Sequence, residues 1–185
     1  MAEPVETPIG TVTAHHFRPA SVRHRVAVGP KALYALFAPG DAMHPVVRAF
    51  MAFVRDGDLS YRRVVANDHA VDEAATRLKK RASQERAATM LATLDESDVY
   101  RRDVVDEDVV ADAAERFVDW EDHGGSFTDF VVAAHMDDEG LDHVLSFDRH
   151  LEAFDVTTVP YRTYETYNGQ EISRPAHHGS SFSPS

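Results

Sequence analysis

Short apolar segments alternate with amphipathic helices along most of this chain, and this alternation constrains the fold more than any other feature. The segments predicted as strands are residues 23–28, 59–65, 99–105, 143–147 and 156–159. Apolar residues recur at helical spacing in residues 32–37, 44–55, 67–78, 83–94, 106–120, 126–139 and 149–154. Because each crossover helix returns the chain to the same edge of the sheet, strands joined in this way pair in parallel. The pattern therefore predicts an α/β fold, a three-layer α/β/α sandwich around a mostly parallel sheet.

The two ends of the chain lack this alternation. Residues 1–22 are rich in Pro, Thr and Glu and have no apolar period, so we expect an irregular N-terminal lead-in. Residues 163–185 are polar and rich in Gly, Ser, Pro and His, and we expect them to form a disordered tail. Residues 23–162 remain as one domain, and their length suits a single hydrophobic core.

The composition excludes several kinds of chemistry. The chain has no cysteine, which excludes disulfides, thiolate zinc sites, iron–sulfur clusters and cysteine nucleophiles. No apolar run approaches the roughly 20 residues that a membrane helix needs. The first ten residues lack both the basic and the apolar region of a secretory signal. We therefore expect a cytoplasmic protein that does not associate with a membrane.

The charge of the chain is strongly acidic. Asp and Glu number 31 against 19 Lys and Arg, so the formal net charge is −12. Few lysines and many aspartates are typical of a halophilic surface, although an ordinary acidic cytosolic protein would share this balance. The overall field repels nucleic acid at low salt, so a role on nucleic acid needs a local site. The densest basic stretches, Arg62-Arg63 and Lys79-Lys80-Arg81, are candidates for phosphate contacts, though a solvated helix face is the simpler interpretation of the second.

Three carboxylates lie near the starts of predicted helices. Asp148 directly follows the strand segment 143–147, Asp129 lies three residues after Ser126, and Glu73 lies in the first turns of the helix after segment 59–65. Each has a purely structural interpretation: Asp148 as a helix N-cap, Asp129 in a capping box with Ser126, and Glu73 as an exposed helix carboxylate.

Taken together, the three acids suggest a metal site. In a doubly wound sheet they would converge at the edge where ligands bind. Converging carboxylates repel one another and stay together only with cations between them. Ligand sets made of oxygen atoms suit Mg²⁺ or Mn²⁺, and such ions activate water for phosphodiester hydrolysis.

The order of these motifs resembles PIN domains, the nuclease fold of VapC-type toxins and of many RNA-processing enzymes. The resemblance rests on Ser126-Phe127-Thr128-Asp129, on Ala133-Ala134-His135-Met136 and on residues 140–148. The acids of the first and last of these motifs, Asp129 and Asp148, are 19 residues apart. Residues 71–78 resemble the family's helix that carries the second acid, at the position of Glu73. The resemblance covers roughly residues 25–161. It implies a PIN-type sandwich in which Glu73, Asp129 and Asp148 hold Mg²⁺ or Mn²⁺ and act catalytically on RNA.

The first family motif departs from the pattern. In the family an apolar strand ends in Asp-Thr-Ser or Asp-Thr-Asn, whereas here Val26-Ala27-Val28 is followed by Gly29-Pro30-Lys31. Gly29 stands where the first catalytic aspartate is expected, and Lys31 brings a cation close to the expected metal, with which it competes. Asp41 is a candidate substitute ligand, whereas Asp72 points about 100° away from Glu73 around the helix.

Two functions follow from the resemblance and its departure. The first is a metal-dependent endoribonuclease, a candidate toxin of a toxin–antitoxin pair, with a small antitoxin protein as its partner. The second is a catalytically degenerate PIN-like module that binds RNA or a protein and acts as a regulator. We expect a homodimer in either case.

Overall fold

A computed structural model describes residues 3–7, 10–19, 21–122, 124–148 and 150–160 of the chain. The predicted polar tail, residues 163–185, lies outside the described residues. Within the described part of the chain, no helix combines the length and the apolar character needed to cross a membrane.

Five parallel strands form the central sheet, in the order β5-β4-β3-β6-β7. They are β3 (Arg25–Val28), β4 (Arg63–Asn67), β5 (Tyr100–Asp103), β6 (His143–Leu145) and β7 (Thr157–Val159). From β3 the chain first builds the sheet outward through β4 and β5, and then returns to the other side of β3 with β6 and β7. The strand order therefore reverses between β3 and β6.

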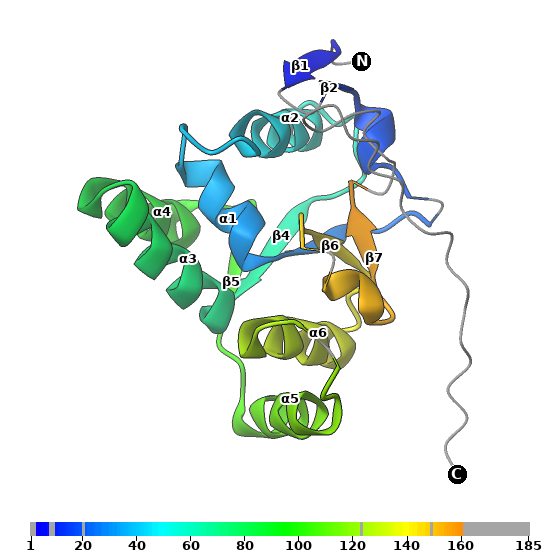
Figure 1. Cartoon of the computed structure of the whole chain (residues 1–185). Helices are drawn as coiled ribbons and strands as arrows, with labels where there is room; N and C mark the ends of the chain where they lie inside the picture. Colours follow the sequence, from blue (N-terminus) through cyan, green and yellow to red (C-terminus); the bar gives the residue numbers. More distant parts are fainter. Residues whose placement is uncertain (1–2, 8–9, 20, 123, 149, 161–185) are drawn as a thin grey trace.

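Helices cover both faces of the sheet and complete the three layers, which confirms the predicted α/β class (Figure 1). On one side lie α1 (Pro30–Phe37), α2 (His44–Arg55), α3 (Asp68–Arg81) and α4 (Gln84–Glu96), whose apolar side chains share a core. On the other side α6 (Phe127–Glu139) packs against the sheet, and α5 (Glu107–Asp119) packs outside α6.

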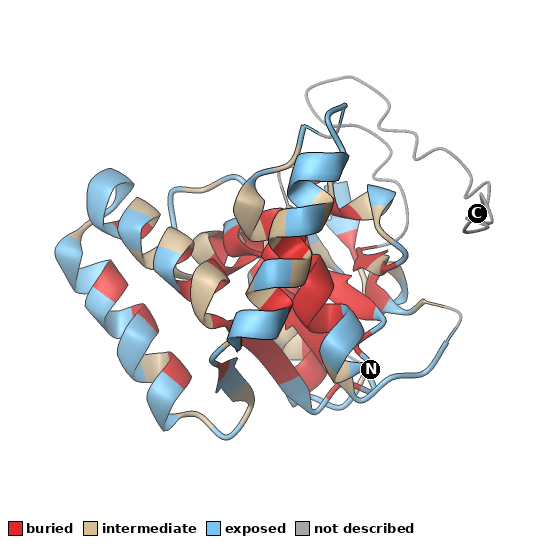
Figure 2. Cartoon of the chain, turned by 90° about the horizontal axis from the view of Figure 1, so that it is seen from below, coloured by how far each residue is buried: buried red, intermediate tan, exposed pale blue. Residues whose placement is uncertain are grey.

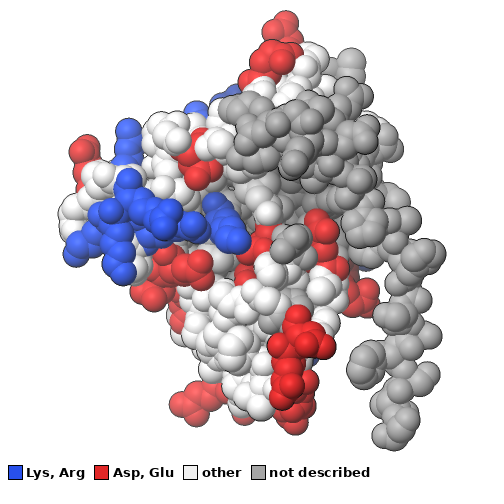
Figure 3. Space-filling view, viewed as in Figure 1, with Lys and Arg blue, Asp and Glu red and all other residues white. Residues whose placement is uncertain are grey.

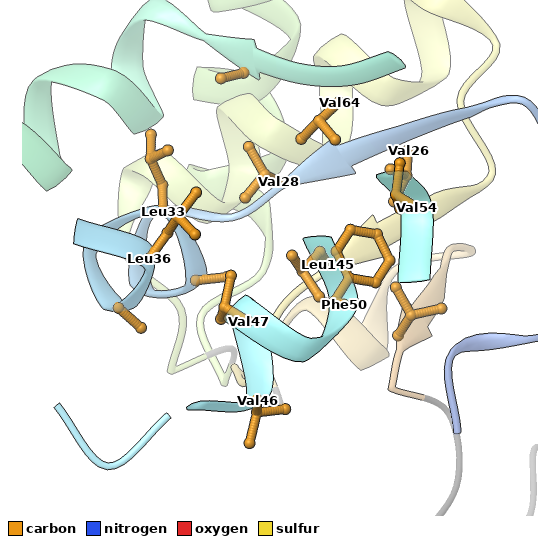
Figure 4. Close-up of a cluster of buried hydrophobic side chains, with 14 of the residues drawn as sticks. Val26, Val28, Leu33, Leu36, Val46, Val47, Phe50, Val54, Val64 and Leu145 are labelled. Atoms are coloured by element: carbon orange, nitrogen blue, oxygen red, sulfur yellow. The ribbon is translucent and has the colours of Figure 1, made fainter. Parts of the chain in front are cut away.

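Alternate residues of the central strands supply the two cores. Val26 and Val28 of β3 face α1 and α2, as Figure 4 shows together with Val64 of β4 and Leu145 of β6. Ala27, between the two valines, faces the opposite core, where residues of α6 pack. Figure 2 shows the buried residues along the strands and on the inner faces of the helices. Burial on both faces explains why the central strand β3 has the apolar run Val26-Ala27-Val28, whereas the edge strand β5 carries charged residues.

The N-terminal residues are more ordered than the sequence predicted. β1 (Val5–Thr7) and β2 (Gly10–Val12) form an antiparallel pair, and the 3₁₀ helix η1 (Ala14–Phe17) follows. Val12 and Phe17 are fully buried, and the Phe17 ring packs against Phe50 of α2 with the ring centroids 5.3 Å apart. These two buried side chains anchor the segment on the core, where an irregular lead-in was expected.

Two other elements differ in length from the prediction. β4 begins at Arg63 rather than near Leu59, because the Arg62 and Arg63 amides both donate to the carbonyl of His24 and residues 59–62 form a loop before the strand. The predicted helix over residues 149–154 is one short 3₁₀ turn, η2 (Leu151–Ala153).

Candidate functional site

The reversal of strand order places the ends of β3 and β6 side by side. The Gly29 amide, directly after β3, donates a hydrogen bond to the Leu145 carbonyl at the end of β6 (2.9 Å). In open α/β sheets, ligands bind beyond the carboxyl ends of the strands at such a reversal. The residues that follow β3 and β6, chiefly Gly29, Lys31 and Asp148, are therefore the candidate site.

Gly29 leaves little room beside β6. A Cβ atom at Gly29 would lie 3.3 Å from Ser146 Oγ and 3.5 Å from Leu151 Cδ1. Gly29 has φ −75° and ψ 158°, so its backbone conformation is open to any residue. An aspartate at this position is thus compatible with the backbone but requires Ser146 to shift by a few tenths of an ångström.

Asp148 is paired with a cation from α1. Its side chain is 9% exposed, and its Oδ2 lies 2.5 Å from Lys31 Nζ. Its Oδ1 accepts a hydrogen bond from the His150 amide (3.1 Å), and its own amide donates to Ser146 Oγ (2.9 Å). Asp148 thus shapes the turn after β6 instead of capping a helix, and the positive charge of Lys31 balances its negative charge.

The charge state of Asp148 follows from these contacts. Burial by itself would raise the pKa of Asp148, but the hydrogen bond from Lys31 and that from the His150 amide outweigh burial and lower the pKa below its ordinary value. Asp148 is therefore a carboxylate at neutral pH, and Lys31 is the nearest positive charge to it.

Asp129 lies in the first turn of α6 and is 3% exposed. Its Oδ2 accepts hydrogen bonds from the Ser126 amide (2.8 Å) and from Ser126 Oγ (2.9 Å). These contacts form the capping box that the sequence suggested as its structural role. Since the chain passes from the end of α6 into the start of β6, the first turn of α6 lies toward the carboxyl edge of the sheet.

Glu73 lies in the second turn of α3 and is half-buried, whereas the neighbouring Asp72 is exposed. Asn67, the last residue of β4, caps α3 by accepting the Ala70 amide (2.8 Å). Close to this cap, the His69 ring contacts the Phe127 ring at the start of α6, with the centroids 6.2 Å apart. The starts of α3 and α6 are therefore neighbours at the carboxyl edge of the sheet.

Asp41, the candidate substitute ligand, lies at the other end of α1 from Lys31. It lies four residues after Phe37, the last residue of α1, and its Oδ1 accepts a hydrogen bond from the Met43 amide (2.9 Å). The eight residues of α1 extend about 12 Å along the helix axis. Asp41 therefore shapes the turn before α2.

Ligand-type side chains converge more tightly elsewhere. Among the described residues, Asp103, His135 and Glu139 are the group of three whose ligand atoms all lie within 4.8 Å of one another. Glu73, Asp129 and Asp148 do not form such a group. The metal-binding role of these three acids therefore stays a prediction from the sequence.

The Asp103 cluster, which consists of Asp103, His135 and Glu139 with Arg25 and Arg101, is already balanced in charge. Arg101 contacts Asp103 Oδ1 (2.6 Å) and Glu139 Oε1 (3.0 Å), and Arg25 contacts Glu139 Oε2 (2.9 Å). The remaining oxygen, Asp103 Oδ2, is buried and lies 3.2 Å from His135 Nε2 without the alignment of a hydrogen bond. A divalent cation here would face two guanidinium groups, so the cluster fits an ion-pair network better than a metal centre.

The Asp103 cluster was not predicted from the sequence, although the sequence carries one signal of it. Arg101 and Asp103 are two residues apart in β5, and residues so spaced point to the same face of a strand. A charged pair on a face that α6 covers requires partners on α6, and His135 and Glu139 provide them.

The site as a whole fits a divalent cation poorly. Gly29 provides no side-chain ligand, the ammonium group of Lys31 lies against Asp148, and one oxygen of Asp129 is held by Ser126. A metal ion that bound Asp148 would meet the Lys31 charge at close range, and like charges in one pocket repel. The structure thus shows Lys31 paired with Asp148 at the carboxyl edge of the sheet.

Comparisons with known proteins find similar folds among solved structures but no similar family model or curated sequence. No protein-family model matches the sequence, and no curated protein matches it. Among solved structures, VapC20 of Mycobacterium tuberculosis, described as a sarcin-ricin loop cleaving toxin, has a TM-score of 0.62 and 26% identity. The match covers 69% of this chain and 93% of that one.

A second solved structure, FitAcB from Neisseria gonorrhoeae, has a TM-score of 0.51 and 18% identity, and the match covers 74% of this chain and 98% of that one. At this identity the match shows the fold alone. Both likenesses agree with the five-stranded parallel sheet and its two helical layers. The fold of this chain is therefore PIN-like, the fold that the sequence motifs predicted.

Proposed function

We propose that this chain is a VapC-like protein that binds RNA at the carboxyl edge of its sheet and does not cut it through a divalent metal. The observation that carries the proposal is the contact of Lys31 with Asp148, beside a glycine at the end of β3. In PIN domains a first aspartate would follow this strand, so two changes act together: an acidic ligand is missing and a cation stands near its place.

The choice of RNA rests on similarity to a structure of known activity. VapC20 is described as cleaving the sarcin-ricin loop, and this chain matches nearly all of it. The carboxylates Glu73, Asp129 and Asp148 stand at the positions that the sequence resemblance to PIN domains assigns to acidic residues. A small antitoxin protein and a second copy of this chain are further proposed partners.

An active ribonuclease is the second candidate. It is favoured by the burial of Asp129 and Asp148, which are 3% and 8% exposed, since buried acids with partial hydrogen bonding are costly unless they have a role. In that case Glu73, Asp129 and Asp148 would hold Mg²⁺ or Mn²⁺, and Lys31 would have to turn away from Asp148 first.

Cleavage of a labelled single-stranded RNA separates the two candidates. The assay uses Mn²⁺ in concentrated KCl, because the composition predicts a salt-adapted protein, and compares wild type with Asp129→Asn and with Gly29→Asp/Lys31→Ser. We expect wild type to leave the RNA intact in this assay and to bind it at lower KCl concentrations, and the double variant to gain Mn²⁺-dependent cleavage. Gly29→Ala/Lys31→Ser is the matched control for the crowding of Ser146 and should remain inactive.

Two outcomes of this assay would contradict the first proposal. If wild type cleaves the RNA and Asp129→Asn does not, the chain is an active metal-dependent ribonuclease and the first proposal is wrong. If wild type neither binds nor cleaves RNA, both candidates fail.

A further inference from the structure

The turn between α3 and α4 concentrates positive charge on an otherwise acidic chain. Within the described residues, no acidic side chain forms an ion pair with the cations of this region, which are Arg77, Lys79, Lys80, Arg81 and Arg86. In the view of Figure 3, Lys and Arg side chains gather over α3 and α4 and reach toward acidic side chains near the middle of the face. Such a cluster of cations is unexpected on a chain whose net charge is −12.

Stabilisation of the helices accounts for part of this charge only. Lys79, Lys80 and Arg81 occupy the last turn of α3, where cations interact favourably with the helix dipole. Arg86, however, is the third residue of α4, and a cation in the first turn of a helix is disfavoured by the same dipole. Arg86 therefore has no evident structural reason to be basic, and an anion bound nearby would supply one.

Two of these cations, together with Lys31 of α1, connect this region to the candidate site. The Arg77 guanidinium carbon lies 5.2 Å from the centroid of the Tyr34 ring on α1. Tyr34 is one helical turn after Lys31, so these two side chains share a face of α1. Arg81 is one turn after Arg77 on α3. Lys31, Arg77 and Arg81 thus follow one another from Asp148 toward the turn between α3 and α4.

A hollow lies at the far end of this row. Its volume is about 310 Å³, and it is lined by Tyr34, Asp41, Arg81, Ser83 and Arg86, with residues 38–40 and Ala82. The one acid in the lining, Asp41, already accepts the Met43 amide. Two arginines and a serine at the start of a helix make a suitable lining for a phosphate group.

We propose that Lys31, Arg77, Arg81 and Arg86, here named the basic row, bind the phosphodiester backbone of single-stranded RNA and lead it from the α3–α4 turn to Asp148. This inference rests on the proposed function and adds the path of the RNA to it. Three of the four cations are arginines, whose planar group binds phosphate through paired hydrogen bonds. Arg77 and the Tyr34 ring also offer planar groups on which bases stack, which an acidic peptide would not use.

The test measures RNA binding by the full-length protein without added metal. A fluorescent single-stranded RNA of about 12 nucleotides is followed by anisotropy at several KCl concentrations. The variant Arg81→Gln/Arg86→Gln removes two cations of the basic row. The control Arg48→Gln/Arg55→Gln removes two exposed cations from α2, neither of which is placed near the basic row. Both variants change the net charge equally, and equal thermal melting curves would show that both are folded.

We expect the basic-row variant to bind RNA about tenfold more weakly at low salt and the control to bind nearly as tightly as wild type. The slope of log K against log[KCl] should become shallower by about 1.4 in the basic-row variant, since each single-strand phosphate contact contributes about 0.7.

Three outcomes would overturn the inference, and they are distinguishable. If wild type does not bind RNA, the proposed function fails together with the path. If wild type binds RNA and the two variants lose the same affinity and slope, RNA binds elsewhere and the proposed function remains. If poly-glutamate of similar length displaces RNA from wild type as well as unlabelled RNA does, the basic row is a surface for acidic protein and the assignment to RNA is wrong.

Discussion

The contact of Lys31 with Asp148 has a measurable energy. Exposed ion pairs contribute about 0.2–1 kcal/mol, and removal of one partner from a fully buried pair costs about 3–5 kcal/mol. This pair lies between the two cases, because the Asp148 side chain is 9% exposed and the Lys31 side chain is 47% exposed. We therefore expect Lys31→Met, which keeps most of the aliphatic stem, to lower the free energy of unfolding by about 1–2 kcal/mol.

A double-mutant cycle isolates the pair from other effects of each substitution. Urea unfolding of wild type, Lys31→Met, Asp148→Asn and the double variant should give a coupling energy of about 1 kcal/mol. For a chain of this size, 1 kcal/mol corresponds to about 2–4 °C in Tm. A coupling energy below about 0.3 kcal/mol would show that the two side chains do not interact in solution and would refute the reasoning.

The pH dependence of the coupling gives a second check. The pKa of Asp148 is lowered in the folded protein, so the stabilisation is fully present above the ordinary value of 3.8 and is lost as the pH falls through the lowered pKa. The coupling should therefore be constant between neutral pH and about pH 5. A coupling that disappears near neutral pH would contradict the assignment of the negative charge to Asp148.

Three further predictions concern residues outside this pair. Ser126→Ala removes the capping box of α6 and should lower the free energy of unfolding by about 1 kcal/mol in thermal melts, whereas Ser126→Asp should retain most of it. Burial, aided by the charge of Arg23, lowers the pKa of His143, so wild type should lose stability as the pH falls below about 6.5. Urea titrations at pH 7 and pH 5 should show that His143→Gln reduces this dependence of stability on pH. Arg101→Met removes one of the positive charges that balance Asp103 and Glu139, so Mn²⁺ should raise the Tm of the variant and leave the Tm of wild type unchanged. An equal rise in both proteins would make the Asp103 cluster a native metal site.

The layers and the sheet could be predicted because their sequence signal is strong. The strands β3 and β6 are buried on both faces and therefore read as continuous apolar runs, and the helices between strands show the 3.6-residue period. The N-terminal pair β1 and β2 was missed because strands of three residues are too short to show a period. Phe17 marks the segment as packed only when its neighbours on α2 are known.

The site illustrates a different limit. Topology brings the ends of β3 and β6 together, so the proximity of Gly29 and Asp148 to one edge follows from the order of the elements. Whether Lys31 reaches Asp148 depends on the rotamer of a long side chain and on the turn that Ser146 and His150 shape, neither of which the sequence specifies. The Asp103 cluster joins β5 to α6 across the sheet, and such a pairing of distant segments leaves only a weak local signal.

Manganese binding measured by electron paramagnetic resonance tests the central claim most directly, because it reports the ion itself and does not depend on activity. The titration compares wild type with Gly29→Asp/Lys31→Ser and with Asp148→Asn. The account predicts that wild type leaves Mn²⁺ free in solution and that the double variant binds about one ion per chain. Tight binding of Mn²⁺ by wild type that Asp148→Asn abolishes would contradict it, since Lys31 would then not hold the place of the metal.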